Sequence, residues 1–531
     1  MTVKRTGRKM ALWIAVALLL AVLLLCACAC SLLGKKIPSR GKSGSNQASE
    51  TIEDEILTLS YREKTVKKGV PLVTALSDLV VGGTGGRLSL AELTLSGEYD
   101  PARSGNYEIT LSRGDASATV TLFVAEEGVT ASACYPTLDE CAAEYDLSVD
   151  VPSTGRVEIL VIPIGFTNKH YDSASELLET AFNGRAEETG WHSLCSYYER
   201  SSYGLLSLHA TILPTYKTGK SWSAKKKGSP EKEYLAAALD YYDEEIDYSR
   251  FDANHDGIID CVCMVYLAPY DEDSDLWWAY WDTLDEDYET EDEVLTRNYL
   301  WLSVDFFSDP LPVEGAINVE TLAHEMGHML GLEDYYDYEE EIYGGLGDSD
   351  MMDGTQGDHD PFSKAILGWI RPTVLFRADY DALLSPFEEN GEALFIMKEG
   401  KESYFQECFV VCYYTPTGLY ALRSQEEEGI FSLPGVLIYH VTADLKDPSE
   451  MTSLIEIYQT SNGKNPRLIR ICEADEDNSI DETGCAEDED LFQEGATFSP
   501  NWNDGTSAGF TLTVSSLSEE GAQVSVLYAA A

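Results

Sequence analysis

The chain has 531 residues, of which 44% are hydrophobic and 24% are charged. This length and composition suit a protein with two or three packed cores, and they exclude a disordered chain or a multi-span membrane protein. The formal net charge of −55 predicts no binding to nucleic acid, because an acidic surface repels phosphates. It favours calcium and solubility, although a solvated acidic surface without a specific partner explains most of the charge.

Residues 1–30 are typical of an export segment. Four basic residues precede an apolar run, and the following Leu-Cys-Ala-Cys resembles a bacterial lipoprotein cleavage box with Cys28 as the lipid-bearing residue. An uncleaved signal anchor is the alternative. Residues 31–54 read as a flexible tether rich in Ser, Gly and Lys. We therefore expect an extracellular protein anchored to the outer face of the bacterial cytoplasmic membrane, with simple secretion as the second possibility.

Residues 55–125 predict a small β-sandwich. Short runs such as 107–111 and 118–124 alternate polar and apolar residues, with glycine turns between them. The segment weakly resembles a bacterial Ig-like domain, for which a spacer role is expected and ligand binding is the alternative. Residues 126–154 form a connector.

Residues 155–372 predict a catalytic domain of α/β (α+β) class. The apolar run 157–164 fits a buried strand, and helical patterns follow at 174–182 and 232–242. Short alternating strands then return, so residues 373–531 are predicted to form a β-rich C-terminal region packed on the catalytic domain.

Residues 324–334 carry the most informative pattern, His-Glu-Met-Gly-His-Met-Leu-Gly-Leu-Glu-Asp. Apolar residues recur around it at helical spacing, and at about 100° per residue His324 and His328 fall together on the opposite face. Gly331 permits the left-handed residue that ends a helix and turns the chain back. Asp334 is then the natural third ligand, and Glu333 is a weaker candidate.

These residue types suit zinc catalysis. Zn²⁺ accepts imidazole nitrogens and carboxylate oxygens, and a catalytic site leaves one position for water. Glu325 lies beside the ligands, so it can take a proton from the attacking water and pass it to the leaving amine. The sequence predicts an endopeptidase that hydrolyses proteins or peptides through a zinc-activated water. An inactive cell-surface adhesion or carbohydrate-binding protein is the alternative, and Cys195 as a nucleophile competes poorly.

Several segments together resemble the immune-inhibitor-A-like family of bacterial secreted zinc metallopeptidases. Beyond the zinc motif, the matching pieces lie at 197–204, 252–260, 351–353, 364–369 and 435–441. The resemblance spans roughly residues 155 to 520. It implies a metzincin-like catalytic domain, zinc held by two histidines and an aspartate, and protein substrates.

A second ion site is expected upstream of the zinc motif. Positions 1, 3, 5 and 9 of a calcium loop are occupied by Asp252, Asn254, Asp256 and Asp260. Cys263 stands where an EF-hand has its bidentate glutamate, so another carboxylate would have to complete the site. A plain Asx-rich turn is the alternative.

Three further features border the predicted site. Met352 follows His328 by 24 residues and is placed to form the methionine turn that metzincin-like enzymes share, with Met351 as a substitute. His359 lies in a Gly-Asp-His-Asp turn, where a lone histidine is more often solvated than placed at a cleft. The aromatic run 276–281 predicts either a substrate groove or a buried cluster.

Overall fold

The computed structural model describes residues 57–529, except 61–62, 68, 78, 84–85, 98, 102–104, 115, 126–134, 146, 148, 150, 272, 337–343, 426–429 and 446–465. The predicted export segment with Cys28 and the predicted tether lie outside the described residues. The described chain is a mixed α/β protein with several sheets. None of its helices combines the length and apolar character that a membrane span requires.

The first part of the described chain forms two small sheets around a common core. One sheet has the order β1 (Thr58–Leu59), β3 (Val81–Gly83), β4 (Gly86–Leu88). The other has the order β2 (Glu63–Lys67), β7 (Ala116–Ala125), β6 (Gly105–Arg113), β5 (Thr94–Ser96). The alternating runs are strands as predicted, because Ile109 and Val120 pair across β6 and β7 and both are fully buried. The predicted connector contains a helix, α3 (Leu138–Tyr145).

The central sheet has six strands. They are β8 (Gly155–Gly165), β9 (Leu206–Ile212), β10 (Tyr216–Lys217), β11 (Val262–Tyr266), β12 (Tyr280–Glu289) and β13 (Leu295–Ser303). The order is β10-β8-β11-β13-β12, with β9 also paired to β8. All pairs are parallel except β12 with β13, so the only antiparallel strand among these six lies at an edge. Continuous burial of β11 fits a strand covered on both faces.

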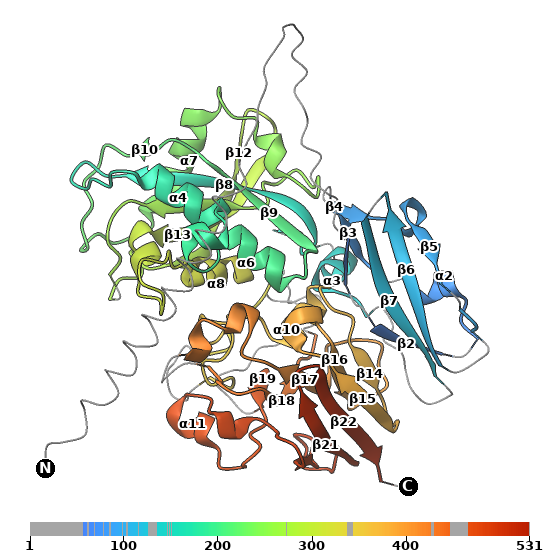
Figure 1. Cartoon of the computed structure of the whole chain (residues 1–531). Helices are drawn as coiled ribbons and strands as arrows, with labels where there is room; N and C mark the ends of the chain where they lie inside the picture. Colours follow the sequence, from blue (N-terminus) through green and yellow to red (C-terminus); the bar gives the residue numbers. More distant parts are fainter. Residues whose placement is uncertain are drawn as a thin grey trace, which may run out of the picture. The chain divides into compact units, whose positions relative to one another are not determined.

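Helices cover both faces of this sheet. They are α4 (Ala174–Asn183), α5 (Ala186–Thr189), α6 (Leu194–Ser201), α7 (Pro230–Tyr242), α8 (Glu320–Met329) and α9 (Pro361–Ile366). Successive side chains of β8 point to opposite faces of the sheet, so they enter two different hydrophobic cores. Ile159 and Val161 share a core with α4, α6 and α8, whereas Leu160 and Ile162 share one with α7 (Figure 1). The predicted buried strand and both predicted helices are therefore confirmed.

The C-terminal region consists of two stacked sheets. One is β14 (Thr373–Leu375), β16 (Ala393–Met397), β17 (Glu407–Tyr414), β18 (Gly435–Thr442), β19 (Ile469–Ile471); the other is β15 (Tyr380–Leu384), β22 (Gly521–Tyr528), β21 (Phe510–Ser518), β20 (Thr497–Phe498). Two short helices, α10 (Phe387–Asn390) and α11 (Ser479–Thr483), complete it. Val411 packs between the two sheets, whereas Val410 belongs to the same core as α8. The β-rich C-terminal region thus shares a hydrophobic core with α8.

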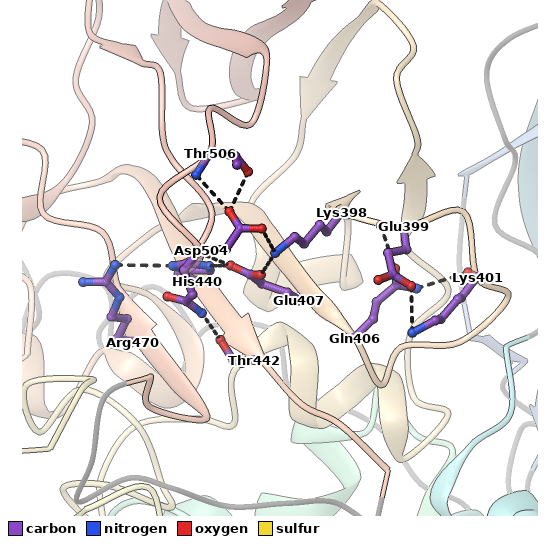
Figure 2. A network of polar contacts seen from close by, with 11 residues as sticks. Lys398, Glu399, Lys401, Gln406, Glu407, His440, Thr442, Arg470, Asp504 and Thr506 are labelled. Carbon is purple, nitrogen blue, oxygen red and sulfur yellow. Dashed lines mark hydrogen bonds and ion pairs between the residues drawn. The ribbon is translucent and has the colours of Figure 1, made fainter.

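A polar network centred on Glu407 crosses the start of β17 (Figure 2). Its carboxylate accepts hydrogen bonds from His440 Nε2 at 3.0 Å and Lys398 Nζ at 2.6 Å. The Arg470 guanidinium donates to His440 Nδ1 at 3.3 Å, so the imidazole is neutral with its proton on Nε2. Burial, helped by the charge of Arg470, lowers the pKa of His440 although Glu407 opposes this. Burial raises the pKa of Glu407, but His440 and Lys398 outweigh it and bring that pKa to about 2.

Candidate metal centre

Helix α8 is defined at both ends by side-chain and backbone hydrogen bonds. Asn318 Oδ1 accepts the N–H of Glu320 at 2.8 Å, so this side chain, two residues before the helix begins, holds its first turn. At the other end Gly331 has φ +90°. The N–H groups of Gly331 and Leu332 bond to the carbonyls of His328 and Gly327, which is the Schellman pattern. The prediction that Gly331 ends the helix is confirmed.

The turn after α8 brings three side chains together. Asp334 Oδ1 lies 2.9 Å from His324 Nε2 and 3.3 Å from His328 Nε2. All three residues are buried, with exposed fractions of 5% to 9%. The group contains Asp334 and not Glu333, as the spacing after Gly331 predicts.

The outer nitrogens of both imidazoles are fixed by backbone carbonyls. His324 Nδ1 donates to Met351 O, and His328 Nδ1 donates to Leu332 O, each at 2.8 Å. A carbonyl can only accept, so each ring carries a proton on Nδ1. When Nε2 gives up its own proton, its lone pair is therefore the one directed toward Asp334. Hydrogen bonds of this kind, from the ring N–H that faces away from the metal, orient histidine ligands in metal sites.

The donor set fits zinc. At zinc–ligand distances of about 2.0–2.2 Å, two ligands of a tetrahedral site lie about 3.3–3.6 Å apart. The measured separations of 2.9 and 3.3 Å from Asp334 are close to this range. Two neutral imidazoles and one carboxylate are also the mixed nitrogen and oxygen set that catalytic zinc sites use.

The charges at this site favour a cation. Burial raises the pKa of Asp334, but hydrogen bonds from the two imidazoles outweigh it and hold that pKa well below its ordinary value. Burial lowers the pKa of His328, yet Asp334 and Glu325 outweigh it and raise that pKa to about 9. Burial also raises the pKa of Glu325, which the two histidines only partly offset. The buried carboxylates of Asp334 and Glu325 therefore favour a positive charge beside the two imidazoles.

Glu325 lies on α8 next to His324 and is 7% exposed. Its carboxylate accepts a hydrogen bond from the backbone N–H of Trp281, on the edge strand β12. The general-base candidate is thus held between the metal helix and the edge of the central sheet, outside the three-ligand group.

The chain beneath α8 carries both methionines. Met351 supplies the carbonyl that accepts from His324, and a Cβ built on Gly327 would lie 2.4 Å from Met352 Sδ. Both methionines are fully buried. The structure therefore places Met352 directly against α8, where a methionine turn is expected.

Sequence reasoning missed two groups that support the site. Arg423 from the C-terminal region makes a two-point ion pair with Glu320 in the first turn of α8, with its Nε 3.0 Å from Oε1. Tyr336 hydrogen-bonds to Asp334, and its ring stacks on that of His324 with centroids 6.1 Å apart. Tyr336 follows Asp334 by only two residues, so its closeness to the site could have been read from the sequence. The pairing of Arg423 with Glu320, 103 residues apart, could not.

In the predicted calcium loop the carboxylate oxygens accept hydrogen bonds from backbone N–H groups of the loop. Asp252 accepts from the N–H groups of Asp256 and Gly257, and Asp260 Oδ2 accepts from that of Ala253 at 2.7 Å. Among the described residues, this loop contributes no group of three carboxylates close enough to share an ion. Asp260 is 1% exposed and burial raises its pKa to about 7. Cys263 lies in β11, as the strand pattern predicts.

Three candidates from the sequence remain: His359, the aromatic run 276–281 and Cys195. The prediction of a solvated His359 is wrong, because its ring is fully buried against Tyr198 and Trp369. In the aromatic run, Trp277 is a core residue and the Trp281 ring packs against the core that contains α8, while only the backbone N–H of Trp281 bonds to Glu325. Burial raises the pKa of the Cys195 thiol to about 12, so no thiolate forms there at neutral pH.

Comparison with profiles of known protein families and with curated proteins finds no match to this chain.

Proposed function

We propose that this protein is a zinc-dependent endopeptidase. The observation that carries the proposal is the convergence of His324 Nε2, His328 Nε2 and Asp334 Oδ1 on one point, with Glu325 beside it. Zn²⁺ held there supplies a Lewis acid that polarises a carbonyl and makes water a nucleophile at neutral pH. Glu325 takes the proton of the attacking water and delivers it to the amine of the broken peptide bond.

The substrate is a protein or peptide in an extended conformation. Strand β12 pairs only with β13 among the described strands, so main-chain groups on its other edge remain for pairing with a peptide, apart from the Trp281 N–H that donates to Glu325. This hydrogen bond supports a substrate path beside the proposed general base. A peptide paired along β12 would therefore run past the proposed zinc site formed by His324, His328 and Asp334.

The fold supports the same proposal. A parallel sheet with one antiparallel edge strand, a metal helix and Met352 packed under that helix are in keeping with a metzincin-like catalytic domain. The two-sheet unit before it supports an Ig-like spacer. For the location we propose the outer face of the bacterial cytoplasmic membrane, through lipid on Cys28 or an uncleaved anchor, with secretion as the alternative.

The test combines metal content with hydrolysis of a denatured protein by the full-length chain. We expect one zinc per chain and cleavage that a chelator abolishes and zinc restores. His324→Ala should lose both, whereas Glu325→Gln should lose cleavage only. Zinc binding without cleavage of any denatured protein would favour the inactive adhesion or carbohydrate-binding protein instead.

A further inference from the structure

A second convergence of acidic groups lies in the C-terminal region, far along the chain from the zinc motif. Oxygens of Glu473, Asp475 and Asp490 all lie within 4.8 Å of one another. Glu473 and Asp475 follow β19, and Asp490 ends a short helical turn at 488–490. The Ala474 N–H donates to the Asp490 carbonyl at 3.1 Å, so the two segments are held side by side by their backbones.

Asp490 is the side chain that requires a partner. It is fully buried, and only its Oδ2 accepts a hydrogen bond, from the Glu487 N–H at 2.7 Å. Its Oδ1 is buried and has no hydrogen-bond partner among the described residues, and the same holds for Glu473 Oε2. Two buried carboxylate oxygens without donors are costly unless a proton or a cation lies between them.

The surrounding negative charges make these buried carboxylate oxygens still more costly without a cation. The charges that act most strongly on Asp490 are the carboxylates of Glu473, Asp475 and Asp477. Burial, together with these charges, raises the pKa of Asp490 to about 7. No cation stands among the charges that act most strongly on Asp490 or Glu473, and Arg467 pairs with a different carboxylate of the loop, Asp481, at 2.6 Å.

The chemistry of the donors selects the cation. All three are hard carboxylate oxygens, which suit Ca²⁺ and disfavour zinc or copper. With Ca–O distances of about 2.3–2.6 Å, ligands on opposite sides of one Ca²⁺ lie up to about 5 Å apart, so oxygens within 4.8 Å can share one ion. Asp475 is exposed, which leaves that side open for the waters that usually complete a calcium shell.

We propose that Glu473, Asp475 and Asp490 form a calcium site that orders the loop between β19 and β20. The end of β19 and this loop are both hydrogen-bonded to the chain that leads toward Met351. Ile471 N–H in β19 donates to Gly345 O, and Ala486 N–H in the loop donates to Gly347 O, each at 2.9 Å. The bound ion would therefore hold in place the segment that ends at Met351, the carbonyl partner of His324.

The test is calcium binding by the full-length protein, measured by equilibrium dialysis with metal analysis and by thermal unfolding. Asp490→Asn and Glu473→Gln should each remove one calcium per chain without changing zinc content. Asp475→Asn, at an exposed position that folding tolerates, should weaken that calcium by at least about tenfold, because ligand charge sets calcium affinity. Glu482→Gln, an exposed carboxylate on α11 outside the group, should leave binding unchanged.

These measurements do not depend on peptidase activity, so they can succeed or fail separately from the proposed function. Asp256→Asn serves as the control for the upstream loop, and its effect should add to that of Asp490→Asn. Wild-type calcium stoichiometry and affinity in all three cluster variants would overturn the proposal. Absence of calcium binding by the wild-type chain would also overturn it, and would assign a shared proton to the two buried carboxyls.

Discussion

Gly327 of α8 is in direct contact with Met352. A Cβ on Gly327 would meet Met352 Sδ at 2.4 Å and Cε at 3.1 Å, which is closer than side chains pack. The helix can rest on the methionine only because position 327 has no side chain. The glycine inside the zinc motif is thus explained by packing, although glycine is a poor helix former.

Gly327→Ala should destabilise the fold. The methionine end must shift within a fully buried core, and overpacking of this kind costs about 1–3 kcal/mol, partly offset by about 1 kcal/mol of better helix propensity. Met352→Ala in the same chain should recover part of the loss. Urea unfolding of the two single variants and the double variant measures this coupling, and strictly additive effects would show that the two residues do not interact.

Glu325→Ala should lose peptide hydrolysis by about 10²-fold or more while zinc remains bound, because the residue moves a proton and is not one of the three ligands. Turnover on a denatured protein and zinc per chain are measured on the same sample. More than about a tenth of wild-type turnover would refute the assigned base. His328→Ala is the matched contrast, since it should release the metal.

Asp334→Ala should weaken zinc retention strongly, and Glu333→Ala should not. Only Asp334 reaches both imidazoles, at 2.9 and 3.3 Å. Competition with a coloured zinc chelator gives the two affinities under identical conditions. A larger loss in the Glu333 variant would move the third ligand to that residue.

Calcium should also raise the melting temperature through the loop at 252–260. An ion that binds only the folded state stabilises it by about 2.7 kcal/mol at a hundredfold excess over its dissociation constant. Asp256→Ala should remove this part of the response without releasing zinc. If Asp252→Ala combined with Asp256→Ala leaves the full response, the loop binds no calcium and the hydrogen-bonded turn is its whole role.

The neutral state of His440 should make stability depend on pH. Because burial lowers the pKa of the folded imidazole, the unfolded chain binds more protons below about pH 6.5. The contribution of His440 is therefore fully present above that pH and is lost as the pH falls toward the folded pKa. The difference in free energy of unfolding between wild type and His440→Gln should grow from about pH 5 to 7 and then stay constant.

A pH-independent difference would contradict this assignment. His170→Gln provides the control, because that imidazole is exposed and its replacement should change stability little. Glu407 acts in a separate range, since its pKa is lowered to about 2 and its contribution is lost only in stronger acid.

The features that could be predicted from the sequence are local ones. The helical period around His324 and His328, the left-handed Gly331 and the apolar run of β8 each lie within a dozen residues, so backbone geometry alone determines them. Asp334 belongs to the same class, because the Schellman turn fixes where the chain goes after Gly331.

The features that could not be predicted join distant segments. Arg423 reaches Glu320 across about a hundred residues, and Asp490 meets Glu473 from the far side of a helix. His359 is buried because the rings of Tyr198 from α6 and Trp369, which follows α9, pack against it, and no local polarity signal reveals this. In the loop at 252–260 the spacing predicts an ion site, but it does not predict which backbone N–H groups the Asp side chains accept.

The ion pair between Arg423 and Glu320 makes the metal helix dependent on chain that is synthesised about a hundred residues later. Glu320 is 3% exposed, and removal of the guanidinium from such a pair costs about 3–5 kcal/mol. A nascent or proteolytically shortened chain that lacks Arg423 would carry every proposed zinc ligand and still have a weakened first turn of α8. The proposed site would then be complete in its residues before it is complete in its support.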